Sequence, residues 1–150
     1  MLKRLYVHNY KCLVNFEIHF DQDVSLFLGG NGSGKTSALS VLSKVQQFVY
    51  FSDSIDDVFK TSLFTRWLQE NTQKFEIDVE GNNGIYSYAL EIEHEKHKDY
   101  IRVKTETLKF NNQFLYKFEI EEEKGKTVGK GELFNDCLLY TSPSPRDQRG

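Results

Sequence analysis

The spacing of hydrophobic residues divides the chain into a helical middle between two stretches that alternate like strands. Near the start, Leu2–Val7 places Leu5 and Val7 on one face. Asn15–Phe20 alternates apolar and polar residues at every second position, so both segments are predicted to be strands. Val24–Leu28 is a continuous apolar run of the kind found in buried strands, and we expect a third strand there.

The middle of the chain follows the three- and four-residue spacing of helices. A first helix is predicted over Lys35–Phe51, where the apolar positions are Ala38, Leu39, Val41, Leu42, Val45 and Val49. The short polar residues at 52–54 can accept hydrogen bonds from the free N–H groups of a helix start, so a second helix is expected to follow. Its apolar stripe, interpreted as core packing, consists of Ile55, Val58, Phe59, Leu63 and Trp67.

From Lys74 onward the period returns to two, which predicts an antiparallel meander of at least four strands. Its predicted connections are a hairpin turn at Gly81–Gly84, a polar link at His94–Asp99, a turn at Asn111–Asn112 and a charged turn at Glu121–Lys126. The predicted fold class is α/β, with a mixed sheet around a glycine-rich loop and its helix, and an antiparallel β-meander as an arm.

A glycine-rich motif lies between the buried strand and the first helix. Residues 29–36 are Gly29, Gly30, Asn31, Gly32, Ser33, Gly34, Lys35 and Thr36, the pattern of a phosphate-binding loop (P-loop, or Walker A motif). Glycines let backbone N–H groups point inward at a polyphosphate, and the following helix offers its positive N-terminal end to the same charge. In this motif the lysine reaches the β- and γ-phosphates, and the threonine hydroxyl ligates Mg²⁺.

A glycine-rich hairpin turn is the alternative interpretation of these residues. It requires a second strand after the turn, and Ser37–Gln47 does not alternate. The order strand, loop, helix therefore favours a P-loop NTPase lobe.

Composition narrows the class of protein. The chain has 150 residues, of which 39% are hydrophobic, and its net charge is −3, so we expect one domain without a global basic field for nucleic acid. No apolar run is long enough to span a bilayer. Cys12 and Cys137 lie far apart, which indicates a reducing compartment, the cytoplasm. Cys12 is interpreted as a small, partly buried hydrophobe.

Residues 137–150 differ in character from the rest of the chain. Both prolines lie there and the second half is polar, which predicts a disordered tail. The stretch Cys137–Asp147 also resembles the translation of a transposase-type sequencing adaptor. We therefore expect the natural sequence to stop near Asp136. Residues 1–136 would be a truncated lobe, and residues 137–150 would be non-native.

Other polar clusters have plainer interpretations. His94 and His97 are three residues apart, whereas a metalloprotease helix needs four, so a solvated hairpin tip is favoured. His8 and His19 are interpreted as surface or edge residues. Hydrolysis of a nucleotide needs a second, acidic motif at the end of a buried strand, and no such run occurs between Thr36 and Asp136. We therefore assign no catalytic residue to this chain.

The motifs together resemble a known group. The loop GGNGSGKT, with Leu26–Leu28 before it and the segment NYKCLVNFEIHF at Asn9–Phe20, resembles the start of ABC-class AAA-type ATPases, the relatives of SMC, RecF and OLD-family proteins. Glu106–Leu108, followed by a turn and by Phe114–Phe118, are similar to the antiparallel arm of the OLD-like branch. The resemblance covers most of residues 1–136. The acidic strand, the signature motif and the switch histidine of that group are missing here.

The resemblance implies ATP and Mg²⁺ as cofactors and a second ATPase head, in a homodimer that sandwiches the nucleotide. By matching position, Lys11 would lie near the nucleotide, and Asn31 would shape the loop. The parent would be an ATP hydrolase acting in DNA transactions or phage defence, with DNA contacts through regions absent here and none with a membrane. The truncated chain would be inactive in hydrolysis.

Two other hypotheses use the same loop. A small-molecule kinase would continue with helices after the first helix, and a GTPase would carry an Asn-Lys-x-Asp motif, which the sequence lacks. The third possibility is a non-catalytic nucleotide-binding fragment, in which the apolar faces of the strands would be unusually exposed.

Overall fold

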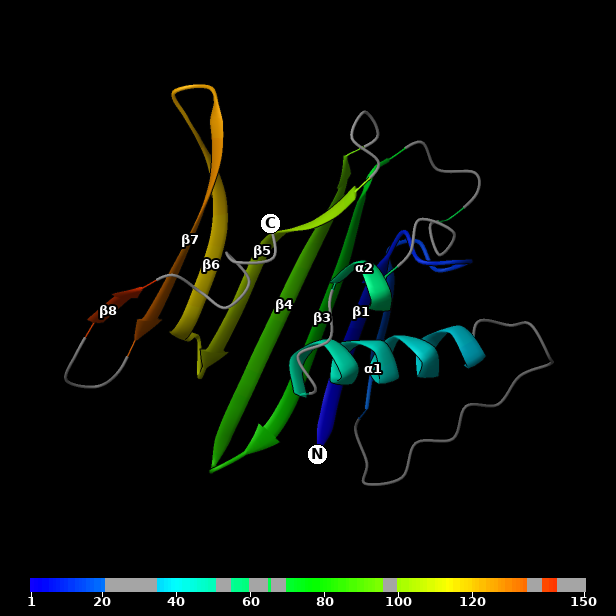
Figure 1. Cartoon of the computed structure of the whole chain (residues 1–150). Coiled ribbons are helices and arrows are strands. Elements are labelled where there is room, and N and C mark those ends of the chain that lie inside the picture. The colour runs from blue at the N-terminus through cyan, green and yellow to red at the C-terminus, as the bar shows by residue number, and fades with distance from the viewer. Residues whose placement is uncertain are drawn as a thin grey trace.

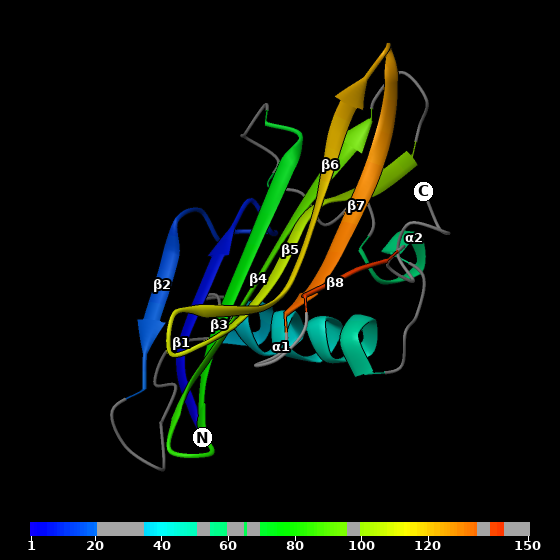
Figure 2. The ribbon, with the colours of Figure 1, turned by 90° about the vertical axis from the view of Figure 1, so that its left-hand side faces the viewer.

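The computed structural model describes residues 1–20, 35–50, 55–59, 65, 70–95, 100–134 and 139–142. These residues form an eight-stranded sheet in the order β2-β1-β3-β4-β5-β6-β7-β8, with two helices. Both views place α1 and α2 on the same side of the sheet, and in Figure 1 α1 lies in front of β1 and β3 (Figure 1, Figure 2). The elements are β1 (Leu2–His8), β2 (Phe16–His19), α1 (Lys35–Tyr50), α2 (Ile55–Val58), β3 (Thr72–Gly81), β4 (Gly84–Glu95), β5 (Tyr100–Phe110), β6 (Gln113–Glu123), β7 (Lys126–Phe134) and β8 (Leu139–Ser142).

All neighbouring strands in the described part of the chain pair antiparallel. The predicted meander is confirmed, because β3 to β7 follow one another in space as in sequence. The prediction of a mixed sheet is not confirmed by these strands. The buried strand expected at Val24–Leu28 lies outside the described residues.

Tight two-residue turns set the register of the meander. Asn82 and Asn83 connect β3 to β4 with φ of 50° and 61°, and Asn111 and Asn112 connect β5 to β6 with φ of 49° and 66°. Asparagine tolerates this left-handed region, and such turns match the twist of antiparallel strands. Both turns lie where the sequence predicted them.

The third hairpin differs from the prediction. The expected turn at Glu121–Lys126 is shorter in the structure, because β6 continues through Glu123 and only Lys124 and Gly125 form the turn. Glu121 is paired with Val128 in the ladder and forms an ion pair with Lys130 across the strands, with a distance of 2.9 Å. A cross-strand cation offsets the repulsion of neighbouring acids, so the charged run is compatible with a strand.

The core lies between α1 and the sheet. The helix buries Ala38, Val41, Val45 and Phe48, which follow helical spacing. The sheet contributes Leu5, Val7, Phe75, Leu90 and Ile92. Each large apolar side chain removed from water stabilises the fold by about 1.5–3 kcal/mol. This burial fixes the position of α1 on the sheet.

The buried face of α1 is narrower than predicted. Leu39 and Val49 were expected on the apolar stripe, but they are 48% and 44% exposed, and Phe48 takes the buried position instead. The second helix is also shorter than expected, although Ile55, Val58 and Phe59 are buried as predicted. Leu63 and Trp67 lie outside the described residues.

A short strand forms in the segment that was predicted to be disordered. The backbone of Leu139–Ser142 pairs as β8 with Gly131–Phe134 of β7. An edge strand presents unpaired N–H and C=O groups, which any nearby segment of adequate β-propensity can satisfy. The disorder and the non-native origin predicted for 137–150 stay predictions.

Candidate functional site

Of the predicted phosphate-binding residues, the structure describes the backbone of the last two, at the start of α1. This helix begins at Lys35, the lysine of the motif, and Thr36 lies in its first turn. That turn carries no acidic residue, so no carboxylate of the helix itself neutralises the positive end of its dipole. The side chains of Lys35 and Thr36 and the residues Gly29, Gly30, Asn31, Gly32, Ser33 and Gly34 lie outside the described part, so their roles stay predictions.

The turn after β1 carries the other predicted site residue, Lys11. Tyr10 and Leu13 close this turn with two backbone hydrogen bonds, of 3.1 Å from the Tyr10 N–H and 2.8 Å from the Leu13 N–H. Lys11 is exposed at the tip with φ of 51°, and its Nζ lies 5.6 Å from the centre of the Tyr10 ring. The ammonium is therefore open to a ligand.

Contacts from two of its residues hold this turn on the first turns of α1. The Tyr10 hydroxyl lies 2.8 Å from Ser40 Oγ, and its buried ring meets Phe75 edge-on, with ring centres 5.9 Å apart. Burial raises the pKa of the Tyr10 phenol, against a smaller opposing effect of the Ser40 hydrogen bond. Cys12 Sγ lies 3.9 Å from Ser37 Oγ. The structure thus brings the turn that carries Lys11 to the helix that follows the P-loop.

Cys12 is exposed, and the expectation that it is a partly buried hydrophobe is wrong. The turn directs the neighbouring Tyr10 and Leu13 into the core and leaves the residues between them at the surface. The thiol is therefore accessible beside the first turn of α1.

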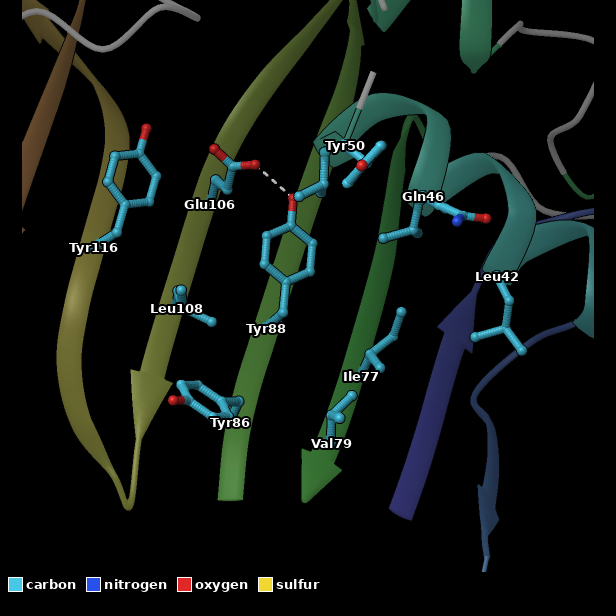
Figure 3. Close-up of a pocket in the computed structure, with 12 residues that line it drawn as sticks. Leu42, Gln46, Tyr50, Ile77, Val79, Tyr86, Tyr88, Glu106, Leu108 and Tyr116 are labelled. Atoms are coloured by element: carbon cyan, nitrogen blue, oxygen red, sulfur yellow. Dashed lines mark hydrogen bonds between the residues drawn. The ribbon is translucent and has the colours of Figure 1, made fainter. Parts of the chain in front are cut away.

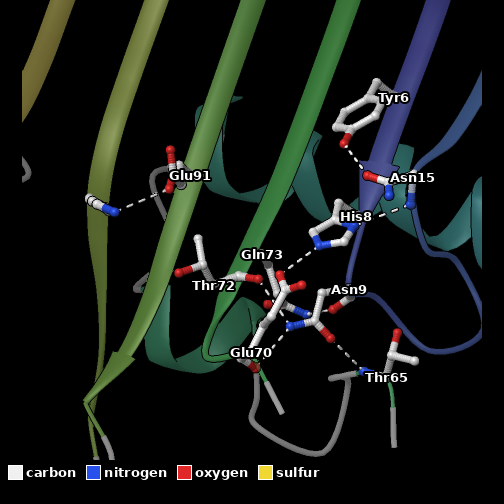
Figure 4. Close-up of polar contacts among 10 residues, drawn as sticks. Tyr6, His8, Asn9, Asn15, Thr65, Glu70, Thr72, Gln73 and Glu91 are labelled. Carbon is white, nitrogen blue, oxygen red and sulfur yellow. Dashed lines mark hydrogen bonds and ion pairs between the residues drawn. The ribbon is translucent and has the colours of Figure 1, made fainter. Parts of the chain in front are cut away.

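Asn9, immediately before this turn, is the centre of a buried hydrogen-bond network (Figure 4). Its Nδ2 donates to the carbonyl oxygens of Glu70 at 3.1 Å and Thr72 at 3.0 Å. Its Oδ1 accepts from the Thr65 N–H at 2.9 Å. Its own carbonyl accepts from Gln73 Nε2, also at 2.9 Å. The network joins the end of β1 to residue 65 and to the start of β3.

His8 extends this network on the same side of the molecule. Its Nδ1 accepts the backbone N–H of Asn15 at 3.2 Å, so the neutral ring carries its hydrogen on Nε2, which faces Glu70 Oε2 at 2.8 Å. His8 and His94 are both buried, so the predictions of a surface position for His8 and a solvated position for His94 are wrong. His97 lies outside the described residues. β4 continues past His94, whose backbone N–H donates to Asn71. His19 is exposed on β2, as predicted.

An apolar groove opens at the other end of α1, between the helix and the sheet (Figure 3). Its volume is about 570 Å³. Six of the lining residues are Leu42, Val49, Ile77, Val79, Tyr86 and Tyr88. On its floor the Tyr88 hydroxyl donates to the buried carboxylate of Glu106 at 2.5 Å. The sequence marked these positions as strand and helix faces, but not as an open groove.

Comparison with protein families decides the class of the chain. A family model for the AAA ATPase domain matches residues 1–134, which include the P-loop, the Lys11 turn and the meander. The chain belongs to the AAA ATPase domain family. Membership implies the P-loop NTPase fold, which confirms the coarse part of the predicted fold class.

Individual relatives in this AAA ATPase group carry the name "DNA replication and repair protein RecF". The protein from Leptospira biflexa is 28% identical over 98 residues, which cover 65% of this chain and 25% of the relative. The one from Coxiella burnetii is 32% identical over 104 residues, covering 69% of this chain and 27% of the relative. The chain therefore spans about a quarter of the length of the curated relatives it matches. The resemblance to the RecF-containing group of AAA-type ATPases is confirmed.

Two negative findings apply to the described residues of this AAA ATPase chain. No group of three or more His, Cys, Asp or Glu side chains is placed there to hold a metal ion. Among the helices that the structure describes, none has the length and apolar character needed to cross a membrane. The side chain of Thr36 lies outside the described part, and its role as metal ligand stays a prediction.

Proposed function

We propose that this chain is the ATP-binding N-terminal lobe of an AAA-type ATPase head. The observation that carries the proposal is the start of α1 at Lys35, directly after the glycines of the motif, in a chain of the AAA ATPase family. The N–H groups of Gly29–Gly34 would surround the phosphates, with Asn31 shaping the loop. Lys35 would contact the β- and γ-phosphates, and Thr36 would ligate Mg²⁺. The contacts of the 10–13 turn with α1 support a place for Lys11 beside the nucleotide.

The proposed role of the parent protein is ATP hydrolysis in DNA transactions. The names of the relatives support the DNA assignment, and phage defence is the second process in which such a head would serve. The head would act as a homodimer in the cytoplasm, with the nucleotide held between two copies. The acidic motif that polarises the attacking water is absent from residues 36–136 of this sequence. The 150-residue chain is therefore expected to bind Mg-ATP and to hydrolyse almost none.

Titration calorimetry with Mg-ATP tests the proposed function. Lys35→Ala should abolish binding, because it removes charge-assisted hydrogen bonds worth about 1.5–3 kcal/mol each. Lys126→Ala is the matched control, because Lys126 is exposed at the start of β7. This variant should bind ATP with the affinity of the unmutated chain. Equal affinities of the two variants would defeat the assignment.

The thiol of Cys12 offers a second test, of where the nucleotide lies. In a Cys137→Ser background, Mg-ATP should slow alkylation of Cys12 by N-ethylmaleimide, because Cys12 lies beside the first turn of α1. The protection should disappear when Lys35→Ala is added. An alkylation rate that Mg-ATP leaves unchanged, in a chain that calorimetry shows to bind ATP, would place the nucleotide away from the 10–13 turn.

A further inference from the structure

We propose that Asn9 is a positioning residue for nucleotide binding, acting through Lys11. This inference rests on the proposed function, because it assumes that Lys11 faces the nucleotide. Asn9 would not touch ATP. Its role is to fix the direction in which the chain leaves β1, and hence the place of the 10–13 turn over the start of α1.

The backbone at Asn9 requires a special residue. Its φ is 63°, in the left-handed region that few residues other than glycine and asparagine adopt readily. Glycine would satisfy that requirement equally well. The backbone alone therefore does not explain why this residue is asparagine and not glycine. The hydrogen bonds of the side-chain amide provide the explanation.

The amide of Asn9 is fully satisfied inside the protein. Both hydrogens of Nδ2 have backbone carbonyl acceptors, Oδ1 has a backbone donor, and the side chain is completely buried. Its partners at residues 65, 70 and 72 belong to segments distant in sequence. A buried, fully satisfied network of this kind holds one geometry, because any rotation would leave a polar group without a partner.

The turn that follows is held over α1 by the buried side chains of Tyr10 and Leu13, and its base is held by Asn9. It is closed by two hydrogen bonds, and Lys11 and Cys12 are exposed at its tip. Tyr10 attaches one side of the turn to α1, and Asn9 attaches its base to the start of β3. With both attachments present, Lys11 is presented at a fixed place beside the P-loop helix. Without the Asn9 amide, the base of the turn loses its side-chain hydrogen bonds to residues 65, 70 and 72.

A double-mutant cycle on ATP affinity tests the inference. Asn9→Gly keeps the backbone conformation and removes the amide, and Lys11→Ala removes the ammonium. Each should weaken Mg-ATP binding about tenfold, the effect of losing one charge-assisted hydrogen bond. The double variant should also be about tenfold weaker, because Asn9 acts only through Lys11. Asn82→Gly, at another left-handed asparagine in the β3–β4 turn, is the control and should bind as the unmutated chain does.

The outcomes separate the two proposals. A hundredfold loss in the double variant, or an unchanged affinity for Asn9→Gly, would overturn the positioning role and leave the ATP-binding assignment intact. An unmutated chain that fails to bind ATP would defeat both. If Asn9→Gly unfolds, Gln73→Met replaces it in the cycle, because this substitution removes the hydrogen bond from Gln73 Nε2 to the Asn9 carbonyl. Trimethylamine N-oxide is then added to favour the folded state. The loss of affinity in Gln73→Met should likewise vanish in the Lys11→Ala background, and a loss that persists there would overturn the inference.

Discussion

The Tyr10 hydroxyl joins the 10–13 turn to α1, and its contribution to the free energy of unfolding can be measured. Its ring is buried against Phe75, and its hydroxyl bonds to Ser40 at 2.8 Å. Tyr10→Phe keeps the ring and should lower the free energy of unfolding by about 1 kcal/mol, with a further cost for the unpaired Ser40 hydroxyl. Urea unfolding followed by circular dichroism measures this change. Ser43→Ala, at an exposed serine of the same helix, should have little effect, in contrast to Ser40→Ala.

The two kinds of site residue differ in how far the sequence could predict them. The P-loop motif can be predicted from sequence because it lies within eight consecutive residues, and its glycines, lysine and threonine have known roles in phosphate and Mg²⁺ binding. In this chain those roles stay predictions. Asn9 has hydrogen-bond partners 56 to 64 residues away, so only the folded chain shows why an asparagine stands there. His8 was misassigned for the same reason, because its partner Glu70 is 62 residues away.

At the scale of elements, turns were predicted better than strand ends. The asparagine pairs at 82–83 and 111–112 determine their turns locally, through their tolerance of positive φ. The end of β6 depends on a partner strand, since Glu119 and Glu121 pair with residues of β7. The narrow buried face of α1 likewise depends on how the helix lies on the sheet. Apolar spacing alone could not show that Phe48 is buried and Val49 exposed.

Gly84 tests the close packing of the first hairpin. A Cβ at this position would lie 2.5 Å from Phe110 Cζ and 2.6 Å from Asn111 Oδ1, and that oxygen also accepts the Ile85 N–H. Gly84→Ala should therefore destabilise the protein by about 1–3 kcal/mol, the usual cost of overpacking. Gly81→Ala is the matched control across the turn, because its Cβ would meet Tyr86 at 3.6 Å, an ordinary contact. Thermal unfolding of both variants measures the difference, and equal losses would contradict the packing argument.

At the scale of the whole molecule, the sheet and the helix leave part of their shared apolar surface open. Alternation in the sequence predicted the strand faces, but it could not show that α1 covers only part of the face formed by β3 to β6. The groove at the C-terminal half of α1 is the result, and its volume lies within the range of about 300–1,000 Å³ typical of binding pockets.

The groove should bind an apolar dye while the protein is folded. Anilinonaphthalene sulfonate fluorescence should rise in the presence of the native chain, and Val49→Gln should reduce that rise by more than half, because Val49 lines the groove. Leu39→Gln provides the control, since Leu39 is similarly exposed on the same helix and is not among the residues that line the groove. Both substitutions lie at exposed positions, so each should change stability by less than about 0.5 kcal/mol. Equal fluorescence of the two variants would mean that the dye binds elsewhere. If the dye fluorescence rises only as the near-ultraviolet circular dichroism is lost, the dye reports loosened packing, as in a molten globule, and not the groove.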